Sequence, residues 1–91
     1  MEHKIAQLRL NIGKRIAQIR SSKGISQTFV ARLMGKTPQW LSNIEKGRRP
    51  IEAAELSQLA KILEVDVAIF YTGELNETLD NNADIPRAAG E

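Results

Sequence analysis

The chain has 91 residues, which is enough for one domain and too few for two. It is 42% hydrophobic and 26% charged, as is usual for a globular domain, and its few aromatic residues leave the core to Ile, Leu, Val and Ala. It has no cysteine and one histidine, His3, which excludes a disulfide scaffold, a thiolate metal site and a cysteine nucleophile. We therefore expect neither a metal nor a cofactor.

Enzymes and membrane proteins are also disfavoured as classes. The chain has no glycine-rich phosphate loop, no evident base beside its serines, and no pair of carboxylates in an apolar setting, so we expect no catalysis. No apolar run reaches the roughly 18 residues of a membrane span, and the N-terminus does not resemble a signal peptide. We expect a cytoplasmic protein.

Charge divides the chain into two parts. Residues 1–73 carry 12 basic and 6 acidic side chains, whereas residues 74–91 carry one basic and five acidic ones. Residues 14–49 hold nine basic side chains against one acid, Glu45. Such a basic block predicts a polyanionic partner. We assign residues 1–73 to a folded domain and residues 74–91 to a polar, acidic tail that is mobile or contributes to dimerisation.

The first helix is predicted over residues 4–22. Ile5, Leu8, Ile12, Ile16 and Ile19 recur in steps of three and four, which places them in one apolar stripe. Gly13 interrupts the helix at a cost of about 1 kcal/mol relative to alanine. A helix that begins at Asn11, as an N-cap after a loose arm, is the alternative.

Caps and glycines delimit the later helices. Ser26 is a good N-cap, Gly35 favours a left-handed turn, and Thr37-Pro38 combines a cap with proline at the first helical position. Asp66 is able to cap the last helix, which is expected to bury Val67 and Phe70. The resulting segments are 27–34, 38–46, 52–63 and 67–71. The sequence therefore predicts an all-α fold of five helices.

Two short helices joined by the turn at Gly35 predict a helix-turn-helix over residues 27–46. Gln39, Ser42, Asn43 and Lys46 share one face of the helix 38–46, about 100° wide, with Leu41 and Ile44 opposite. Glutamine and asparagine amides are able to pair with an adenine edge in the major groove, and Lys46 is able to reach a phosphate. The helix 38–46 is therefore the predicted reading helix.

The stretch from Ile12 to Gly73 resembles the Cro/repressor-type helix-turn-helix proteins, also called the XRE family. The resemblance is carried by the strings IGKRIAQIRSSKGISQ, VARLMGKTPQWLSNIEKGRRP and LSQLAKILEVDVAIFYTG. It implies a five-helix fold whose second and third helices dock on double-stranded DNA.

The resemblance also implies roles for individual residues. Gln27 and Thr37 correspond to phosphate or base-edge contacts, and Lys46, Arg48 and Arg49 to clamps on the DNA backbone. The reading positions hold Pro38, Gln39, Ser42 and Asn43. Pro38 departs from the polar residue sometimes found there, so it is able to touch a thymine methyl group but not to hydrogen-bond a base.

Three further assignments concern packing. The resemblance suggests that Arg20 and Glu45 form a partly buried ion pair, a structural role. Two interpretations of Trp40 stay open, namely an indole N–H that meets a phosphate and simple packing. Phe29 and Leu33 lie away from the inner face of their helix, so we expect them to pack against the segment around Ile5 and Leu8 or against a partner.

The sequence thus predicts a sequence-specific DNA-binding transcriptional regulator, repressor-like and dimeric. A homodimer is expected because one small module buries little surface on DNA. Phe70, Tyr71 and the 74–91 segment are the expected dimer surface. The alternative is an adaptor, antitoxin or co-regulator that retains the same fold.

Overall fold

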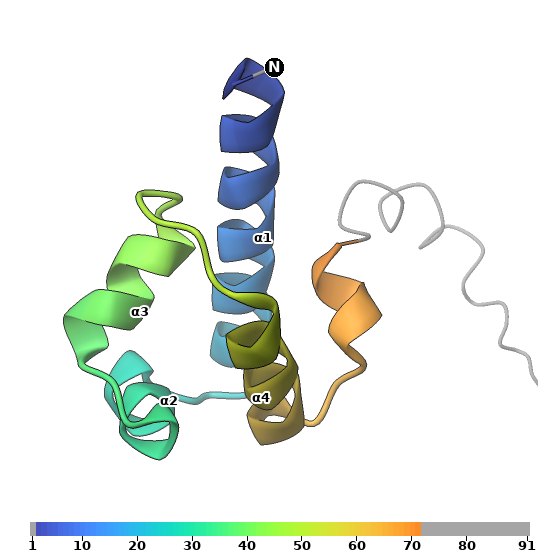
Figure 1. Cartoon of the computed structure of the whole chain (residues 1–91). Coiled ribbons are helices and arrows are strands. Elements are labelled where there is room, and N and C mark those ends of the chain that lie inside the picture. Colours follow the sequence, from blue (N-terminus) through green and yellow to red (C-terminus); the bar gives the residue numbers. More distant parts are fainter. Residues whose placement is uncertain (1, 72–91) are drawn as a thin grey trace, which may run out of the picture.

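The computed structural model describes residues 2–71, and their side chains from residue 4 onward. Four α-helices and a 3-10 helix make up this part of the chain (Figure 1). They are α1 (Glu2–Ser22), α2 (Gln27–Met34), α3 (Pro38–Glu45), α4 (Ala53–Leu63) and η1 (Val67–Phe70). The all-α fold is confirmed, with boundaries that differ from the expected ones by a few residues at most.

The predicted caps begin and end these helices. The Ser26 side chain accepts a hydrogen bond from the Phe29 N–H at 3.0 Å, and Thr37 Oγ1 accepts one from the Trp40 N–H at 3.1 Å. Gly35 takes the left-handed conformation, with φ of 71°, directly after α2. The turn between α2 and α3 is therefore determined by side chains that are local in sequence.

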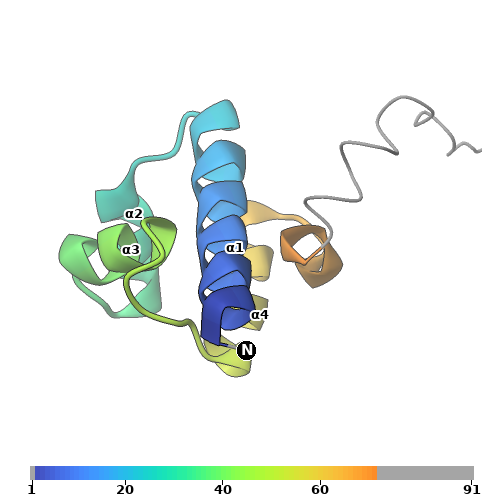
Figure 2. The same cartoon turned by 90° about the horizontal axis from the view of Figure 1, so that it is seen from above.

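Helix α1 runs through the middle of the molecule, with α2 and α3 on one side and η1 on the other, and α4 packs against both α2 and η1 (Figures 1 and 2). It is continuous from Glu2, so the alternative start at Asn11 is wrong. The core that joins the elements is almost entirely aliphatic. Its largest fully buried side chains are Phe70, Ile16, Leu41, Ile44, Leu56, Leu59, Leu63 and Val30.

The expected fifth α-helix is instead a 3-10 helix of four residues. Asp66 caps it by accepting a hydrogen bond from the Ala68 N–H at 2.9 Å. Phe70 is 1% exposed because η1 packs against both α1 and α4, and its ring completes the core. Its assignment to a dimer surface is therefore wrong, whereas Tyr71 is 53% exposed. The 74–91 segment lies outside the described residues.

The proposed packing of Phe29 and Leu33 against the start of α1 is also wrong. The two side chains are about half exposed, as are Ile5 and Leu8. Helix α2 lies near the C-terminal end of α1, far from its N-terminal turns (Figure 1). The reason is that α3 packs along α1, and the turn at Gly35 then directs α2 away from the N-terminus of α1.

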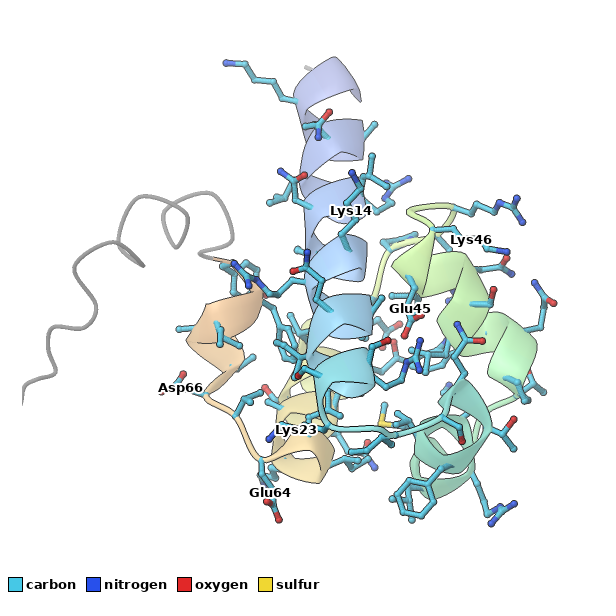
Figure 3. All side chains as sticks on the ribbon, turned by 180° about the vertical axis from the view of Figure 1, so that it is seen from behind. Lys14, Lys23, Glu45, Lys46, Glu64 and Asp66 are labelled. Atoms are coloured by element: carbon cyan, nitrogen blue, oxygen red, sulfur yellow. The ribbon has the colours of Figure 1, made fainter. Side chains whose placement is uncertain are left out.

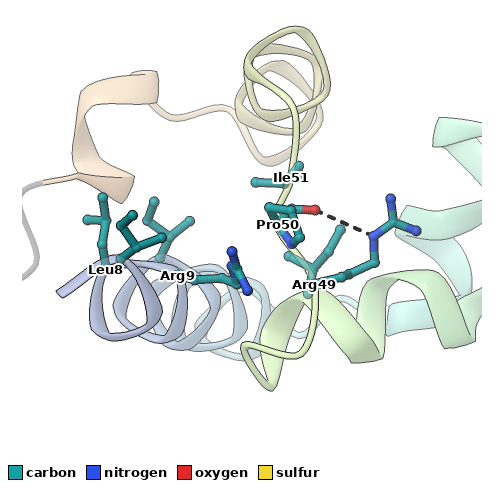
Figure 4. A pocket seen from close by; sticks show the side chains of 8 residues that line it. Leu8, Arg9, Arg49, Pro50 and Ile51 are labelled. Atoms are coloured by element: carbon teal, nitrogen blue, oxygen red, sulfur yellow. Dashed lines mark hydrogen bonds between the residues drawn. The ribbon is translucent and has the colours of Figure 1, made fainter. Parts of the chain in front are cut away.

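The loop between α3 and α4 packs on the N-terminal half of α1 and leaves a small pocket of about 140 Å³ (Figure 4). The pocket is mainly apolar, with two arginine side chains at its border. Its lining residues are Ile5, Leu8, Arg9, Ile12, Ile44, Arg49, Pro50 and Ile51. Gly47 adopts a positive φ of 75° in this loop, where a Cβ atom would lie 3.1 Å from the Leu10 Cα. The loop is thus seated closely on α1.

Within the described residues, none of the helices combines the length and apolar character needed to cross a membrane.

At Gly13 the backbones of α1 and α3 approach each other closely. A Cβ atom built there would lie 2.7 Å from the carbonyl oxygen of Glu45, and closer still to that of Ile44. Both neighbours are backbone atoms at the C-terminal end of α3, so they have little room to move. The helix cost of this glycine is therefore offset by the close approach that it allows.

We expect Gly13→Ala to lower the free energy of unfolding by about 1–3 kcal/mol, because of overpacking against the α3 backbone. Helix propensity alone predicts the opposite sign, a gain of about 1 kcal/mol. Urea unfolding distinguishes the two, with the exposed Gln18→Ala in the same helix as a control that should change little. A more stable Gly13→Ala variant would contradict the close packing.

Candidate nucleic-acid interface

Helix α3 presents a polar outer side and an apolar inner side. Leu41 and Ile44 are buried, whereas Pro38 and Gln39 are exposed and Asn43 is partly exposed. Ser42 is also partly exposed. The structure therefore places all four predicted reading residues where a partner is able to reach them, although their contacts with bases stay a prediction.

The side-chain amides of Gln39 and Asn43 on this outer side form a hydrogen bond with each other. Gln39 Nε2 donates a hydrogen bond to Asn43 Oδ1 at 3.0 Å, one turn along the helix. The main-chain oxygen of Asn43 accepts a hydrogen bond from the Arg48 N–H at 2.8 Å, which fastens the following loop to the end of α3. The reading helix and the basic loop are thus one continuous surface.

Basic side chains surround the end of α3. Lys46 is the C-cap residue, one position beyond the end of the helix, and its side chain is exposed. Arg48 and Arg49 follow on the loop and are also exposed. Figure 3 shows Glu45 between α3 and α1, whereas Lys46 lies at the C-terminal end of α3, where the following loop begins. Cations in this position suit the phosphates that flank a groove.

Thr37 has a structural task in addition to its predicted role. Its side-chain oxygen caps α3, as described above, and Pro38 occupies the first helical turn. A hydroxyl that accepts a hydrogen bond still has its O–H to donate. A phosphate contact by Thr37 is therefore compatible with the cap and stays a prediction.

The predicted Arg20–Glu45 ion pair is confirmed. Arg20 Nε lies 2.8 Å from Glu45 Oε2 and its Nη2 lies 3.0 Å from Oε1, so the guanidinium binds the carboxylate through two parallel hydrogen bonds. Arg20 Nη1 also donates to the Ile25 carbonyl oxygen at 2.8 Å. Glu45 is only 8% exposed. A buried carboxylate of this kind needs its partners, because it has lost most of its hydration.

The second partner of Glu45 is Gln27, a residue that the family resemblance assigned to DNA. Gln27 Nε2 donates a hydrogen bond to Glu45 Oε1 at 2.8 Å, from the first residue of α2. The network therefore joins α1, α2 and α3. Periodicity within one helix gives no signal for a bond between residues 18 positions apart on different helices. Gln27 keeps a second N–H and its carbonyl oxygen, so its contact with DNA stays a prediction.

Trp40 packs rather than pointing outward. It is 7% exposed, and its indole Nε1 is buried without a hydrogen-bond partner among the described residues. The Lys36 Nζ lies 5.4 Å from the centre of the ring and 3.3 Å from Glu55 Oε2. Of the two interpretations of Trp40, the packing one is therefore confirmed and the phosphate contact is wrong, because α3 turns this side chain toward its neighbours and encloses the N–H.

Glu55 connects this region to the start of α4. Its carboxylate accepts a hydrogen bond from the Glu52 N–H at 3.1 Å, as part of a capping box. Burial raises the pKa of Glu55, but the hydrogen bond from Glu52 and the Lys36 ammonium outweigh that effect and leave the pKa below its usual value. Glu55 thus stays ionised at neutral pH and holds Lys36 over the Trp40 ring.

Comparison with known proteins agrees with this geometry. Residues 16–70 match the helix-turn-helix family, which is more than half of the chain. The HTH-type transcriptional regulator RamB of Mycobacterium tuberculosis is 33% identical over 82 residues, which cover 81% of this chain and 17% of RamB. An uncharacterized HTH-type transcriptional regulator of Sinorhizobium fredii, y4wC, is 34% identical over 67 residues, covering 74% of this chain and 47% of y4wC. The chain thus spans less than half the length of these two curated relatives.

Solved structures share the fold. The clp gene regulator ClgR from Corynebacterium glutamicum superposes with a TM-score of 0.71 at 25% identity, over 75% of this chain and 87% of ClgR. The restriction-modification controller protein C.AhdI from Aeromonas hydrophila superposes with a TM-score of 0.69 at 24% identity, over 72% of this chain and 96% of C.AhdI.

We expect Arg20→Ala to lower the free energy of unfolding by about 3 kcal/mol, because it leaves the Glu45 carboxylate buried with one neutral partner. Thermal unfolding measures this, with the exposed Arg32→Ala of α2 as a control of equal charge change. Base preference should stay the same where the variant remains folded. Unchanged melting together with altered base preference would contradict a structural role for the pair.

Proposed function

Because the chain belongs to the helix-turn-helix family of DNA-binding domains, of the XRE or Cro/C1 type, we propose that it is a sequence-specific transcriptional regulator that lays α3 in the major groove of DNA. The observation that carries the proposal is the outer side of α3. Two ordered amides, those of Gln39 and Asn43, face outward beside the exposed Lys46. Amides in this setting suit base edges, and the cation suits phosphate.

The rigidity of α3 supports this reading role. Leu41 and Ile44 anchor its inner side, and the Glu45 carboxylate is held by groups from α1 and α2. Residues on such a fixed helix present their hydrogen-bonding groups at fixed positions. That is what discrimination between bases requires, since a misplaced amide contact is lost.

We also propose that the regulator acts as a homodimer. A single module of this size buries about 600–1,000 Å² on DNA, which is small for a specific site. Two copies on half-sites about 34 Å apart double the contacts and match the symmetry of an inverted repeat. The exposed Tyr71, together with residues 74–91, is the proposed contact between the copies.

The second candidate is an adaptor, antitoxin or co-regulator that works through protein contacts. It is favoured by one observation, the half-exposed Phe29 and Leu33, which lie one turn apart on α2. Such a protein has no need of the amides and cations around α3. DNA binding therefore separates the two candidates.

Selection of binding sites from random duplex DNA at physiological salt tests the proposal. We expect one enriched site made of two inverted half-sites whose centres lie about 34 Å apart or a multiple of this. Weak binding without any enriched sequence, in the range of about 10⁻⁴–10⁻⁶ M, would overturn it and favour the adaptor.

A second experiment separates clamping from reading residues. Arg48→Ala should weaken binding to all sequences alike and reduce the slope of log affinity against log salt by about 1, because one phosphate contact is lost. Gln39→Ala should leave the slope unchanged and relax the preference at one base by about 1–3 kcal/mol. Lys61→Ala, an exposed cation on α4, serves as the control. Identical salt slopes for Arg48→Ala and Lys61→Ala would contradict the clamp.

A further inference from the structure

The two amides on the outer side of α3 are bonded to each other before any partner arrives. Gln39 Nε2 donates to Asn43 Oδ1 at 3.0 Å. Gln39 is exposed and extends from the first turn of α3, so without this bond its long side chain would sample many rotamers. Asn43 is only partly exposed and lies next to the buried Ile44. The shorter, more enclosed amide therefore positions the longer one.

The bond determines which groups remain for a base. One of the two N–H donors of Gln39 is engaged in this hydrogen bond, and the other N–H and the carbonyl oxygen remain available. That combination of one donor and one acceptor is what a bidentate contact with adenine requires. Asn43 has one of the two lone pairs of its oxygen engaged and keeps both N–H donors. It faces outward mainly as a donor, which suits the O6 and N7 acceptors of guanine.

We infer that Gln39 and Asn43 read DNA as one coupled unit, in which Asn43 both contacts its own base and sets the base preference of Gln39. The inference rests on the proposed function. We expect Gln39 to contact an adenine and Asn43 to contact a neighbouring base that presents acceptors, preferably guanine. Asn43 is thus a positioning residue for the contact made by Gln39.

Two substitutions at Asn43 separate the roles. Asn43→Ala removes both the donors and the oxygen that holds Gln39. Asn43→Asp keeps an oxygen that accepts from Gln39 Nε2 but has no N–H donor, and it suits the N4 donor of cytosine. Ser42→Ala is the matched control, because Ser42 lies on the same side of α3 and is not the residue bonded to Gln39.

The experiment is site selection with the full chain, followed by affinity measurements on single-base variants of the selected site. Gln39→Ala first identifies the base position that Gln39 reads. At that position, we expect Asn43→Ala to reduce the discrimination of the wild type by a factor of about 3 to 10, which corresponds to one hydrogen bond. Asn43→Asp should restore discrimination there while changing the preference at its own position from guanine toward cytosine. Ser42→Ala should leave the Gln39 position unchanged.

Two outcomes would overturn the coupling. One is an Asn43→Ala variant that alters only its own base position. The other is an Asn43→Asp variant that loses the discrimination of Gln39 as fully as Asn43→Ala does. Failure of the proposed function gives a different result, because the wild-type chain would then select no site at all. That result would overturn the coupled reading as well. Thermal unfolding of each variant confirms that the fold is retained.

The bond itself is measurable in the free protein. Of the two side-chain N–H resonances of Gln39 in the NMR spectrum, one should be displaced toward the hydrogen-bonded range in the wild type and in Asn43→Asp. It should return to the value of a solvated amide in Asn43→Ala. Equivalent solvated values in all three proteins would overturn the inference without any reference to DNA.

Discussion

The buried carboxylate of Glu45 is the feature on which the arrangement of the first three helices depends. Arg20 from α1 binds both of its oxygens, and Gln27 at the start of α2 binds one of them. A carboxylate that is only 8% exposed has lost most of its hydrogen bonds to water, so these donors must replace them. The donors from α1 and α2 therefore hold the C-terminal end of α3 in the arrangement that satisfies Glu45, which also orients the outer side of α3.

Close backbone packing acts together with this ion pair. Gly13 allows the C-terminal end of α3 to approach α1, and Gly47 allows the next loop to lie against Leu10. Both glycines lie next to residues of the Glu45 network or of the basic loop. Because Gly13 and Gly47 have no side chains, α3 and the following loop lie close to α1, and this fixes the positions of the α3 amides and of the basic residues after them.

Polar groups on α3 are divided between the interior and the surface according to the partners available. Glu45 turns inward to Arg20, whereas Gln39 and Asn43 turn outward and satisfy each other in part. Trp40 lies between these sides and is covered by Lys36, which is in turn paired with Glu55. One short helix thereby combines a firm attachment to the core with a hydrogen-bonding surface.

The local features were predictable from the amino-acid sequence, namely the caps at Ser26 and Thr37, the turn at Gly35 and the outward side of α3, because each depends on residues within one or two helical turns. Its family resemblance also anticipated the pair of Arg20 and Glu45. Three features could not be predicted from the sequence, namely the enclosure of the Trp40 indole, the hydrogen bond from Gln27 to Glu45 and the separation of Phe29 from the start of α1. These depend on how helices distant in sequence cross, and helical periodicity carries no information about that crossing.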